Sequence, residues 1–216
     1  MKFCIFGAGA IGGYLAVELA LAGHEVCAIA RGAHLEGMKE NGVRLLIDGQ
    51  ERHARFPVSD KPADFGHQDF VLCALKAHQA AEAADKFLQL LGPETAVVTA
   101  MTGIPWWYIY KHGGAYEGHV LKSVDPGGRQ WKLIGPERAI GCVVDPACEV
   151  SEPGVIEHRE FKRFTIGEPD RTRSDRVQKL SAALTEAGFE APIRDDVRWN
   201  VWLKLWGNVC VTPVSA

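Results

Sequence analysis

Lys2-Phe3-Cys4-Ile5-Phe6-Gly7-Ala8-Gly9-Ala10-Ile11-Gly12 is the stretch that decides the fold. Its first part, from Phe3 to Phe6, is a short apolar run that indicates a buried strand. Its second part, from Gly7 to Gly12, has the spacing G-x-G-x-x-G. That spacing is weak by itself, but here a strand precedes it, and a helical pattern and a second strand follow it. The combination predicts a βαβ unit that binds a dinucleotide.

We expect each glycine of this turn to have its own physical role. Gly7 permits a tight turn, Gly9 lets the backbone approach a pyrophosphate, and Gly12 allows close packing of the helix on the strand. The N–H groups at the start of the helix, with its positive dipole end, suit phosphates. An ordinary glycine turn without a ligand is the alternative. The predicted cofactor-binding residues here are Gly7, Ala8, Gly9, Ala10, Ile11 and Gly12.

Short apolar runs alternate with helical patterns through the first half of the chain. After the glycine turn, apolar residues recur at Ile11, Leu15, Leu19 and Ala22, and Gly23 is a suitable helix end. This alternation predicts an α/β fold, with a Rossmann-type doubly wound sheet and helices on both of its faces. Further strands are expected at residues 26–30, 70–74, 96–100, 139–144, 154–158 and 164–166, and further helices at 79–91, 177–188 and 196–209.

The residue that follows the second strand decides which dinucleotide is preferred. NAD sites usually place Asp or Glu there, where it binds the ribose 2′-hydroxyl. This chain has Arg31 instead, within Ala28-Ile29-Ala30-Arg31-Gly32, and no carboxylate adjoins it. A guanidinium can make a bidentate contact with a 2′-phosphate. Arg31 therefore predicts a preference for NADP(H), and a solvated surface arginine is the alternative.

Lys76 and Thr102 each follow another predicted strand. In open α/β sheets, ligands bind beyond the carboxyl ends of the strands. We therefore expect Lys76 near the ribose or the nicotinamide, and Thr102 at the same edge of the sheet. The alternative for Lys76 is a solvated lysine at the start of a helix, because lysine is usually exposed.

The last predicted helix carries a polar stripe. Asn200, Lys204 and Asn208 are four residues apart and so share one face. A lysine between two asparagines could bind a substrate carbonyl and carboxylate. From the periodicity alone, the solvated side of an amphipathic helix is the favoured interpretation. That interpretation expects the opposite, buried face to hold Trp202, Leu205 and Val209.

The composition argues against several classes of function. There are 24 basic and 27 acidic residues, a net charge of −3, and hence no basic field for nucleic acid. No apolar stretch is long and uninterrupted enough to span a bilayer. The cysteines and histidines lack metal-ligand spacing, so we expect no metal site. Four cysteines lie in strand-like apolar runs, which favours reduced thiols and a cytoplasmic location; they are Cys4, Cys27, Cys73 and Cys142.

Together these features resemble the ketopantoate reductase (2-dehydropantoate 2-reductase) family. The resemblance spans essentially the whole chain. It implies NADPH-dependent reduction of a small 2-oxo acid on the route to pantothenate, and a homodimer is a further expectation. Besides the glycine turn and Arg31, it rests on Leu75-Lys76-Ala77 with Gln79, Thr102-Gly103-Ile104-Pro105-Trp106-Trp107, Pro153-Gly154-Val155-Ile156-Glu157-His158, Ile166-Gly167-Glu168, and Trp202-Leu203-Lys204-Leu205 with Asn208.

The resemblance also implies roles for individual residues. Lys204 would be the catalytic lysine, close to the ketone oxygen, and Asn208, Thr102 and Lys76 would contact substrate or cofactor. Hydride transfer turns a carbonyl into an alkoxide, and a lysine ammonium can both stabilise that oxygen and protonate it. This implication replaces the solvated interpretation of Lys204.

Two features depart from the family pattern. The family usually has asparagine where this chain has Thr102, so a reductase of another 2-oxo acid stays an alternative. Relatives continue into a helical C-terminal domain that supplies a serine and a glutamate to the substrate pocket. We therefore expect an NADP-binding domain at residues 1–194 and the truncated start of a helical domain at 195–216. A non-catalytic NADP(H)-binding fragment is the third hypothesis.

Overall fold

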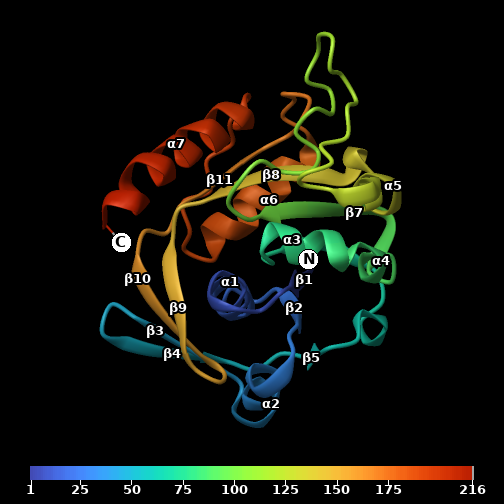
Figure 1. The fold of residues 1–216 in the computed structure, drawn as a ribbon. Helices are drawn as coiled ribbons and strands as arrows, with labels where there is room; N and C mark the ends of the chain where they lie inside the picture. The colour runs from blue at the N-terminus through green and yellow to red at the C-terminus, as the bar shows by residue number, and fades with distance from the viewer. Residues whose placement is uncertain (216) are drawn as a thin grey trace.

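The computed structural model describes residues 1–215, with side chains as far as residue 210. Two sheets organise the fold (Figure 1). In the larger sheet six strands run parallel, and the edge strand runs antiparallel to its neighbour. Its seven strands in spatial order are β11 (Phe164–Gly167), β8 (Ala139–Val144), β7 (Leu91–Ala100), β6 (Gln68–Cys73), β1 (Lys2–Phe6), β2 (Glu25–Ile29) and β5 (Val58–Ser59).

The strand order reverses beside β1. From β1 the chain passes to β2 and β5 on one side, then returns to β6, β7 and β8 on the other. Cys4 of β1 accordingly lies opposite Cys27 on one side and Val71 on the other. Ligands of such sheets bind where the order reverses, beyond the carboxyl ends of the strands. The fold therefore puts the glycine turn, which follows β1, at the expected ligand site.

Helices cover both faces of the larger sheet. Successive residues of a strand point to opposite faces, so Phe3 and Ile5 pack into one core while Cys4 and Phe6 pack into the other. The predicted doubly wound α/β fold is therefore confirmed. The helices are α1 (Ala10–Leu21), α2 (Gly32–Asn41), α3 (Ala77–Glu82), α4 (Ala84–Phe87), α5 (Arg129–Leu133), α6 (Asp175–Glu186) and α7 (Val197–Ser215), with 3-10 turns at residues 62–64, 126–128 and 136–138.

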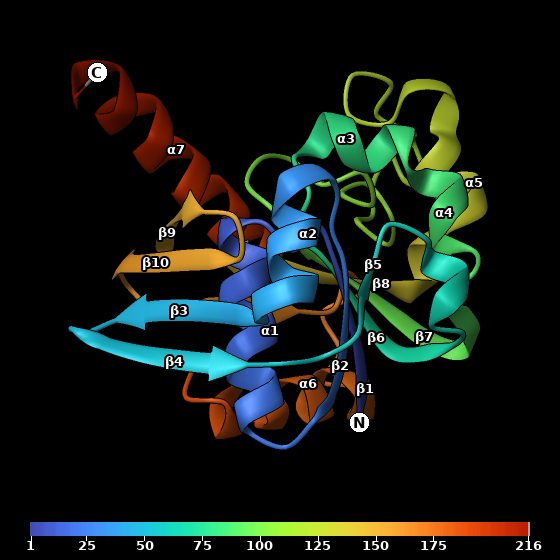
Figure 2. The ribbon, with the colours of Figure 1, turned by 90° about the horizontal axis from the view of Figure 1, so that it is seen from below.

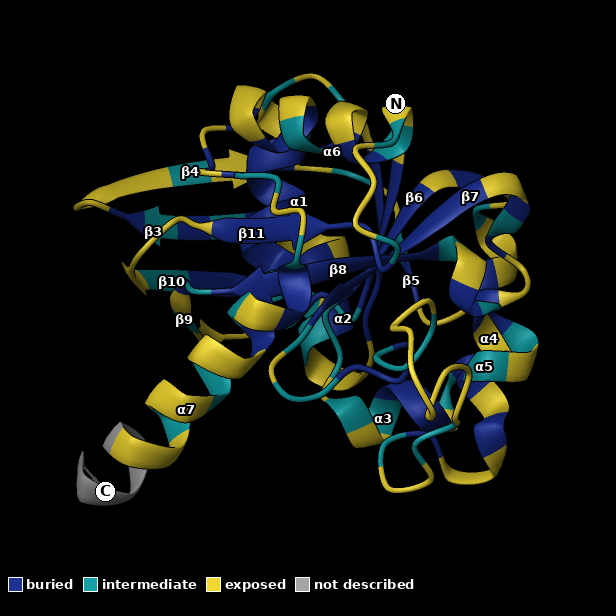
Figure 3. Cartoon of the chain, turned by 90° about the horizontal axis from the view of Figure 1, so that it is seen from above, coloured by how far each residue is buried: buried dark blue, intermediate teal, exposed yellow. Residues whose placement is uncertain are grey.

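A second sheet, which the sequence interpretation missed, covers the far side of α1 (Figure 2). Because α1 lies between two sheets, it is buried along most of its length (Figure 3). The packing is tight: a Cβ added at Gly13 would lie 2.7 Å from Ile156. An almost uniformly apolar helix fits such a position. The four strands in spatial order are β4 (Gln50–Ala54), β3 (Val43–Ile47), β10 (Val155–Glu160) and β9 (Ala147–Glu152).

Most of the predicted elements are present, but the helix predicted at residues 79–91 is wrong. The chain instead forms α3 and α4, separated at Ala83, and Leu91 belongs to β7. Leu91 pairs with Gln68 of the neighbouring strand β6, so the last residue of the predicted helix belongs to a strand. The last helix continues past residue 209 to Ser215. The domain boundary at residues 194 and 195 stays a prediction, and residue 216 lies outside the described residues.

Among residues 1–215, no helix is long and apolar enough to cross a membrane. The same residues bring together no set of three or more His, Cys, Asp or Glu suited to a metal ion. As predicted, Cys4, Cys27, Cys73 and Cys142 are buried within strands. Burial raises the pKa of the Cys73 thiol to about 12, so this cysteine acts as a small packing residue.

Gly12→Ala tests the close packing of α1 on β1. A Cβ at this position would lie 2.2 Å from the Gly7 carbonyl oxygen and 2.9 Å from Cγ2 of Ile5. We expect the free energy of unfolding, measured by urea titration, to fall by about 1–3 kcal/mol because the helix must shift. Gly9→Ala is the matched control, since a Cβ there meets nothing within 4 Å. Equal stability of the two variants would contradict this account of the packing.

Candidate active site

The turn between β1 and α1 has the geometry that its glycines predict. Gly7 has a φ of +98°, which favours glycine. Its N–H and that of Ala8 donate to the carbonyl oxygen of Ile29 in β2, at 3.1 and 2.9 Å. Gly12 packs against the Gly7 carbonyl, whereas a Cβ at Gly9 would enter open space. A ligand can therefore approach the backbone at Gly9.

A pocket of about 780 Å³ lies beside this turn, at the carboxyl ends of β1, β2, β6 and β7. It brings together segments that are far apart in the sequence, at the point where the strand order reverses. Of the predicted cofactor-binding residues only Gly12 does not line it, because Gly12 lies behind the turn. The predicted residues in its lining are Gly7, Ala8, Gly9, Ala10, Ile11, Arg31, Lys76 and Thr102.

Arg31 is exposed at the end of β2, immediately before α2. No carboxylate adjoins it in the sequence, but Asp60 lines the same pocket. Ile29 of β2 pairs with Ser59 of β5, so the residues after both strands meet at one edge of the sheet. The absence of a carboxylate beside Arg31 in the sequence therefore does not extend to the pocket that Arg31 lines. The strand β5, which the sequence interpretation missed, is the reason.

Lys76 and Thr102 are both exposed on the opposite wall of the pocket, after β6 and β7. Lys76 precedes α3 and donates its backbone N–H to Oε1 of Gln79 at 3.4 Å. Behind Thr102 the chain is anchored by Trp107, which is fully buried and donates its ring N–H to the Thr99 hydroxyl at 3.0 Å. The tryptophan is thus a packing residue, and its contact holds the segment that carries Thr102.

The polar stripe of α7 faces the protein together with the buried Val197 and Val201, while other apolar residues of the helix face outwards. Asn200, Lys204 and Asn208 are partly buried, and so is Leu205, whereas Trp202 and Val209 are 52% and 65% exposed. Figure 3 shows the long exposed side of α7. The orientation expected from periodicity alone, with the polar stripe in solvent, is therefore wrong. Periodicity gives the separation of two faces but cannot tell which face has a polar partner.

A second pocket, of about 410 Å³, lies between α7 and the edge of the larger sheet. Lys204 lies there with its ammonium nitrogen 3.6 Å from Oδ1 of Asp145. Asp145 was missed in the sequence, although it directly follows the strand at residues 139–144. The residues that line this pocket are Val143, Asp145, Arg163, Thr165, Arg194, Asn200, Leu203, Lys204, Gly207 and Asn208.

Both pockets reach the carboxyl end of β8. Val144 lines the first pocket and Asp145 lines the second. Lys204 and Asn208 do not line the first pocket, and Thr102 and Lys76 do not line the second. The structure thus brings the predicted site residues together in two neighbouring groups, one suited to a dinucleotide and one carrying a lysine and amides.

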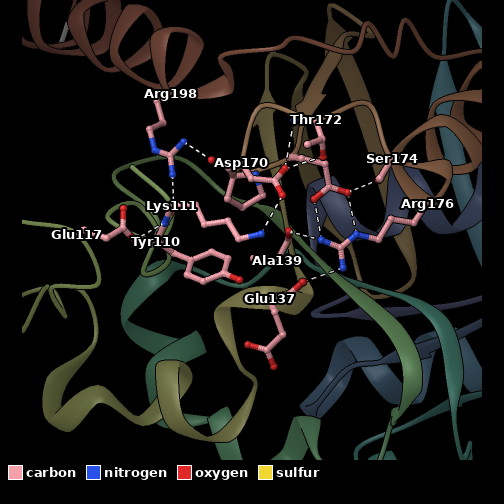
Figure 4. Close-up of polar contacts among 12 residues, drawn as sticks. Tyr110, Lys111, Glu117, Glu137, Ala139, Asp170, Thr172, Ser174, Arg176 and Arg198 are labelled. Atoms are coloured by element: carbon pink, nitrogen blue, oxygen red, sulfur yellow. Dashed lines mark hydrogen bonds and ion pairs between the residues drawn. The ribbon is translucent and has the colours of Figure 1, made fainter. Parts of the chain in front are cut away.

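Arg198 joins α7 to the segment that follows β7 (Figure 4). This buried guanidinium donates to the carbonyl oxygens of Tyr108, Tyr110 and Pro169, at 2.7, 2.6 and 2.6 Å. Burial lowers the pKa of Arg198, but an arginine remains charged. Nothing in the local sequence indicated this role. By holding α7 against residues 108–110, Arg198 fixes the helix that carries Lys204 to the segment that carries Thr102.

A second arginine stabilises the amino end of β8 (Figure 4). Arg176 of α6 binds the buried carboxylate of Glu168 through two hydrogen bonds of 2.7 Å. It also donates to the carbonyl oxygens of Glu137 and Ala139, which flank the start of β8. The Glu168 carboxylate is part of the segment Ile166-Gly167-Glu168, whose function here is structural.

Comparisons with known proteins agree with this architecture. The family model "Ketopantoate reductase PanE/ApbA" matches residues 3–171. A curated 2-dehydropantoate 2-reductase of Mesorhizobium japonicum is 52% identical, over all of this chain and 67% of its own length. A solved structure assigned as a ketopantoate reductase from Ralstonia solanacearum MolK2 has a TM-score of 0.94 and 39% identity, over 99% of this chain and 66% of its own.

A ternary structure of D-mandelate dehydrogenase with NADH and anilino(oxo)acetate has a TM-score of 0.79 but 22% identity, so it shows a shared fold alone. It aligns with 96% of this chain and 61% of its own length. The chain thus spans about two thirds of the length of the proteins that it matches. Sequence, fold and pocket position agree, and the chain belongs to the PanE/ApbA ketopantoate reductase family.

Proposed function

We propose that this protein carries out the NADPH-dependent reduction of 2-dehydropantoate to pantoate, in the synthesis of pantothenate. The family is one of oxidoreductases that use a nicotinamide cofactor. The observation that carries the proposal is the pair of pockets at the carboxyl end of β8, one lined by the glycine turn and Arg31 and the other by Lys204. A cytoplasmic location and a homodimer are part of the proposal.

The residues of the first pocket fit a dinucleotide phosphate. The open space at Gly9 admits the backbone contact that a pyrophosphate needs, and the first turn of α1 has no side-chain cap that would compete for its N–H groups. Arg31 would hold the 2′-phosphate, and Lys76 and Thr102 would hold the ribose and nicotinamide side. When bound, the cofactor supplies a hydride.

The residues of the second pocket fit a small 2-oxo acid. Reduction adds a hydride to the carbonyl carbon and a proton to the carbonyl oxygen, where negative charge develops. The Lys204 ammonium can stabilise this charge and deliver the proton. Asn208 lies on the same face of α7 and can hydrogen-bond the substrate. Asp145, whose Oδ1 lies 3.6 Å from the Lys204 ammonium nitrogen, can orient the ammonium.

Two alternative functions, reduction of another 2-oxo acid and NADP(H) binding without catalysis, can each be distinguished from this proposal by one assay. Thr102 favours a reductase that acts on a different 2-oxo acid, because a hydroxyl lacks the paired donor and acceptor of an amide. A non-catalytic NADP(H)-binding protein would use the first pocket without the second. NADPH oxidation with 2-dehydropantoate, compared with other 2-oxo acids, separates the first two. NADPH binding without oxidation in any of these assays supports the third.

Arg31→Ala tests the preference for NADPH. Loss of charge-assisted hydrogen bonds to a 2′-phosphate should weaken NADPH binding about 10–100-fold, and NADH binding should change little. Fluorescence titration with each coenzyme measures both affinities. Arg129→Ala is the control, because Arg129 is half exposed and pairs with Asp85 outside the pocket. Equal losses for NADPH and NADH would remove this role from Arg31.

Lys204→Ala tests the source of the proton. We expect kcat to fall by about 10²–10⁴-fold, because general acid catalysis contributes that much, while the Kd for NADPH stays unchanged. Steady-state kinetics and a separate coenzyme titration measure the two quantities. Lys179→Ala, an exposed substitution on α6 that touches neither pocket, serves as the comparison. Undiminished turnover in Lys204→Ala would exclude the proposed role.

A further inference from the structure

His34 links the glycine turn to the second sheet. Its Nε2 lies 2.7 Å from the carbonyl oxygen of Ala8, and the backbone N–H of Gly154 donates to its Nδ1 at 3.0 Å. Because Nδ1 accepts a hydrogen bond from the Gly154 N–H, the ring proton must be on Nε2, which donates a hydrogen bond to the Ala8 carbonyl. The two contacts therefore select one neutral form of the imidazole.

The turn that carries Gly154 is packed on α2 backbone to backbone (Figures 1 and 2). A Cβ at Gly37 of α2 would lie 2.7 Å from the Pro153 carbonyl oxygen, and a Cβ at Gly154 would lie 3.1 Å from Gly37. The Gly154 carbonyl in turn accepts a hydrogen bond from the Arg44 N–H of β3, at 2.9 Å. The partner of His34 is thus fixed on two sides by the second sheet and by α2.

On the other side, His34 controls the direction of a peptide group in the glycine turn. The Ala8 N–H donates to Ile29 and its carbonyl accepts from His34, so Ala8 is held at both ends. In a planar trans peptide, the N–H of Gly9 points opposite to the Ala8 carbonyl. Within the described part of the chain, this N–H has no backbone acceptor. His34 therefore leaves the Gly9 N–H directed away from itself and available to a ligand.

We propose that His34 is a positioning residue for the cofactor, through which the Pro153-Gly154 turn of the second sheet holds the glycine turn ready to bind phosphate. The inference rests on the proposed function, since it concerns the same dinucleotide site. It also assigns a role to the segment beginning at Pro153, which that function leaves unexplained. The side chain lines the pocket three residues after Arg31, but it acts through the Ala8 peptide.

His34→Ala and His34→Gln test the proposal. Alanine removes both hydrogen bonds, whereas a glutamine amide can donate to Ala8 and accept from Gly154. We expect His34→Ala to weaken NADPH binding about tenfold, and His34→Gln to recover most of that loss. NADPH fluorescence titration gives the affinities. His53→Ala is the control, because His53 makes a similar contact, with the Asn41 carbonyl oxygen at 2.7 Å, but does not line the pocket.

A second measurement needs no cofactor. Amide hydrogen exchange of Gly154 should accelerate in His34→Ala and stay slow in His34→Gln, because only alanine removes its acceptor. Wild-type affinity in His34→Ala, or equal weakening in both variants, would overturn the positioning role. If the wild-type protein binds no NADPH, the proposed function fails. The exchange rates then decide alone whether the His34 link exists.

Discussion

The contact between Gly12 and the carbonyl oxygen of Gly7 is the constraint on which the rest of the structure depends. It lets α1 begin directly at the end of β1, with no side chain between helix and strand. The start of the helix consequently lies where the strand order of the larger sheet reverses. Phosphate-binding N–H groups, the end of β2 and the ends of β6 and β7 then surround one pocket. The dinucleotide site is thus a consequence of one close backbone approach.

The second sheet makes this arrangement rigid from the other side. α1 is enclosed by two sheets, so its position cannot shift without disturbing both. Glu18, which is buried on α1, is paired with Arg52 of β4 at 2.6 and 2.8 Å, and the pair fixes the helix to this sheet. The hydrogen bonds of His34 continue the same connection to the glycine turn. The second sheet therefore supports the site without forming its main surface.

The local sequence predicted most strands of the larger sheet, the glycine turn and the place of Arg31 after β2, because each depends on residues that are close in the chain. It could not predict what distant segments bring. β3 has alternating burial. Its apolar residues indicate a second sheet only once it is known that they pack against α1. Asp60 reaches the cofactor pocket only because the two residues of β5 pair with β2.

Helix α7 shows the same limit more clearly. The spacing of Asn200, Lys204 and Asn208 predicted that they share one face of the helix, as observed. It could not show that this face lines the second pocket instead of facing solvent. That orientation depends on Arg198, whose three carbonyl acceptors come from other parts of the chain. The family resemblance, rather than periodicity, identified Lys204 as a functional residue. The two-pocket arrangement supports that choice through the position of the helix.

The central claim is that the glycine turn and the neighbouring strand ends form the dinucleotide site. Two-dimensional amide NMR spectra recorded during titration with NADPH test it most directly. The account predicts that the largest shifts fall on residues 7–12 and on Arg31, Lys76 and Thr102, and that the outer strand β4 is unaffected. Saturable shifts confined to other residues, or an unchanged spectrum, would contradict it.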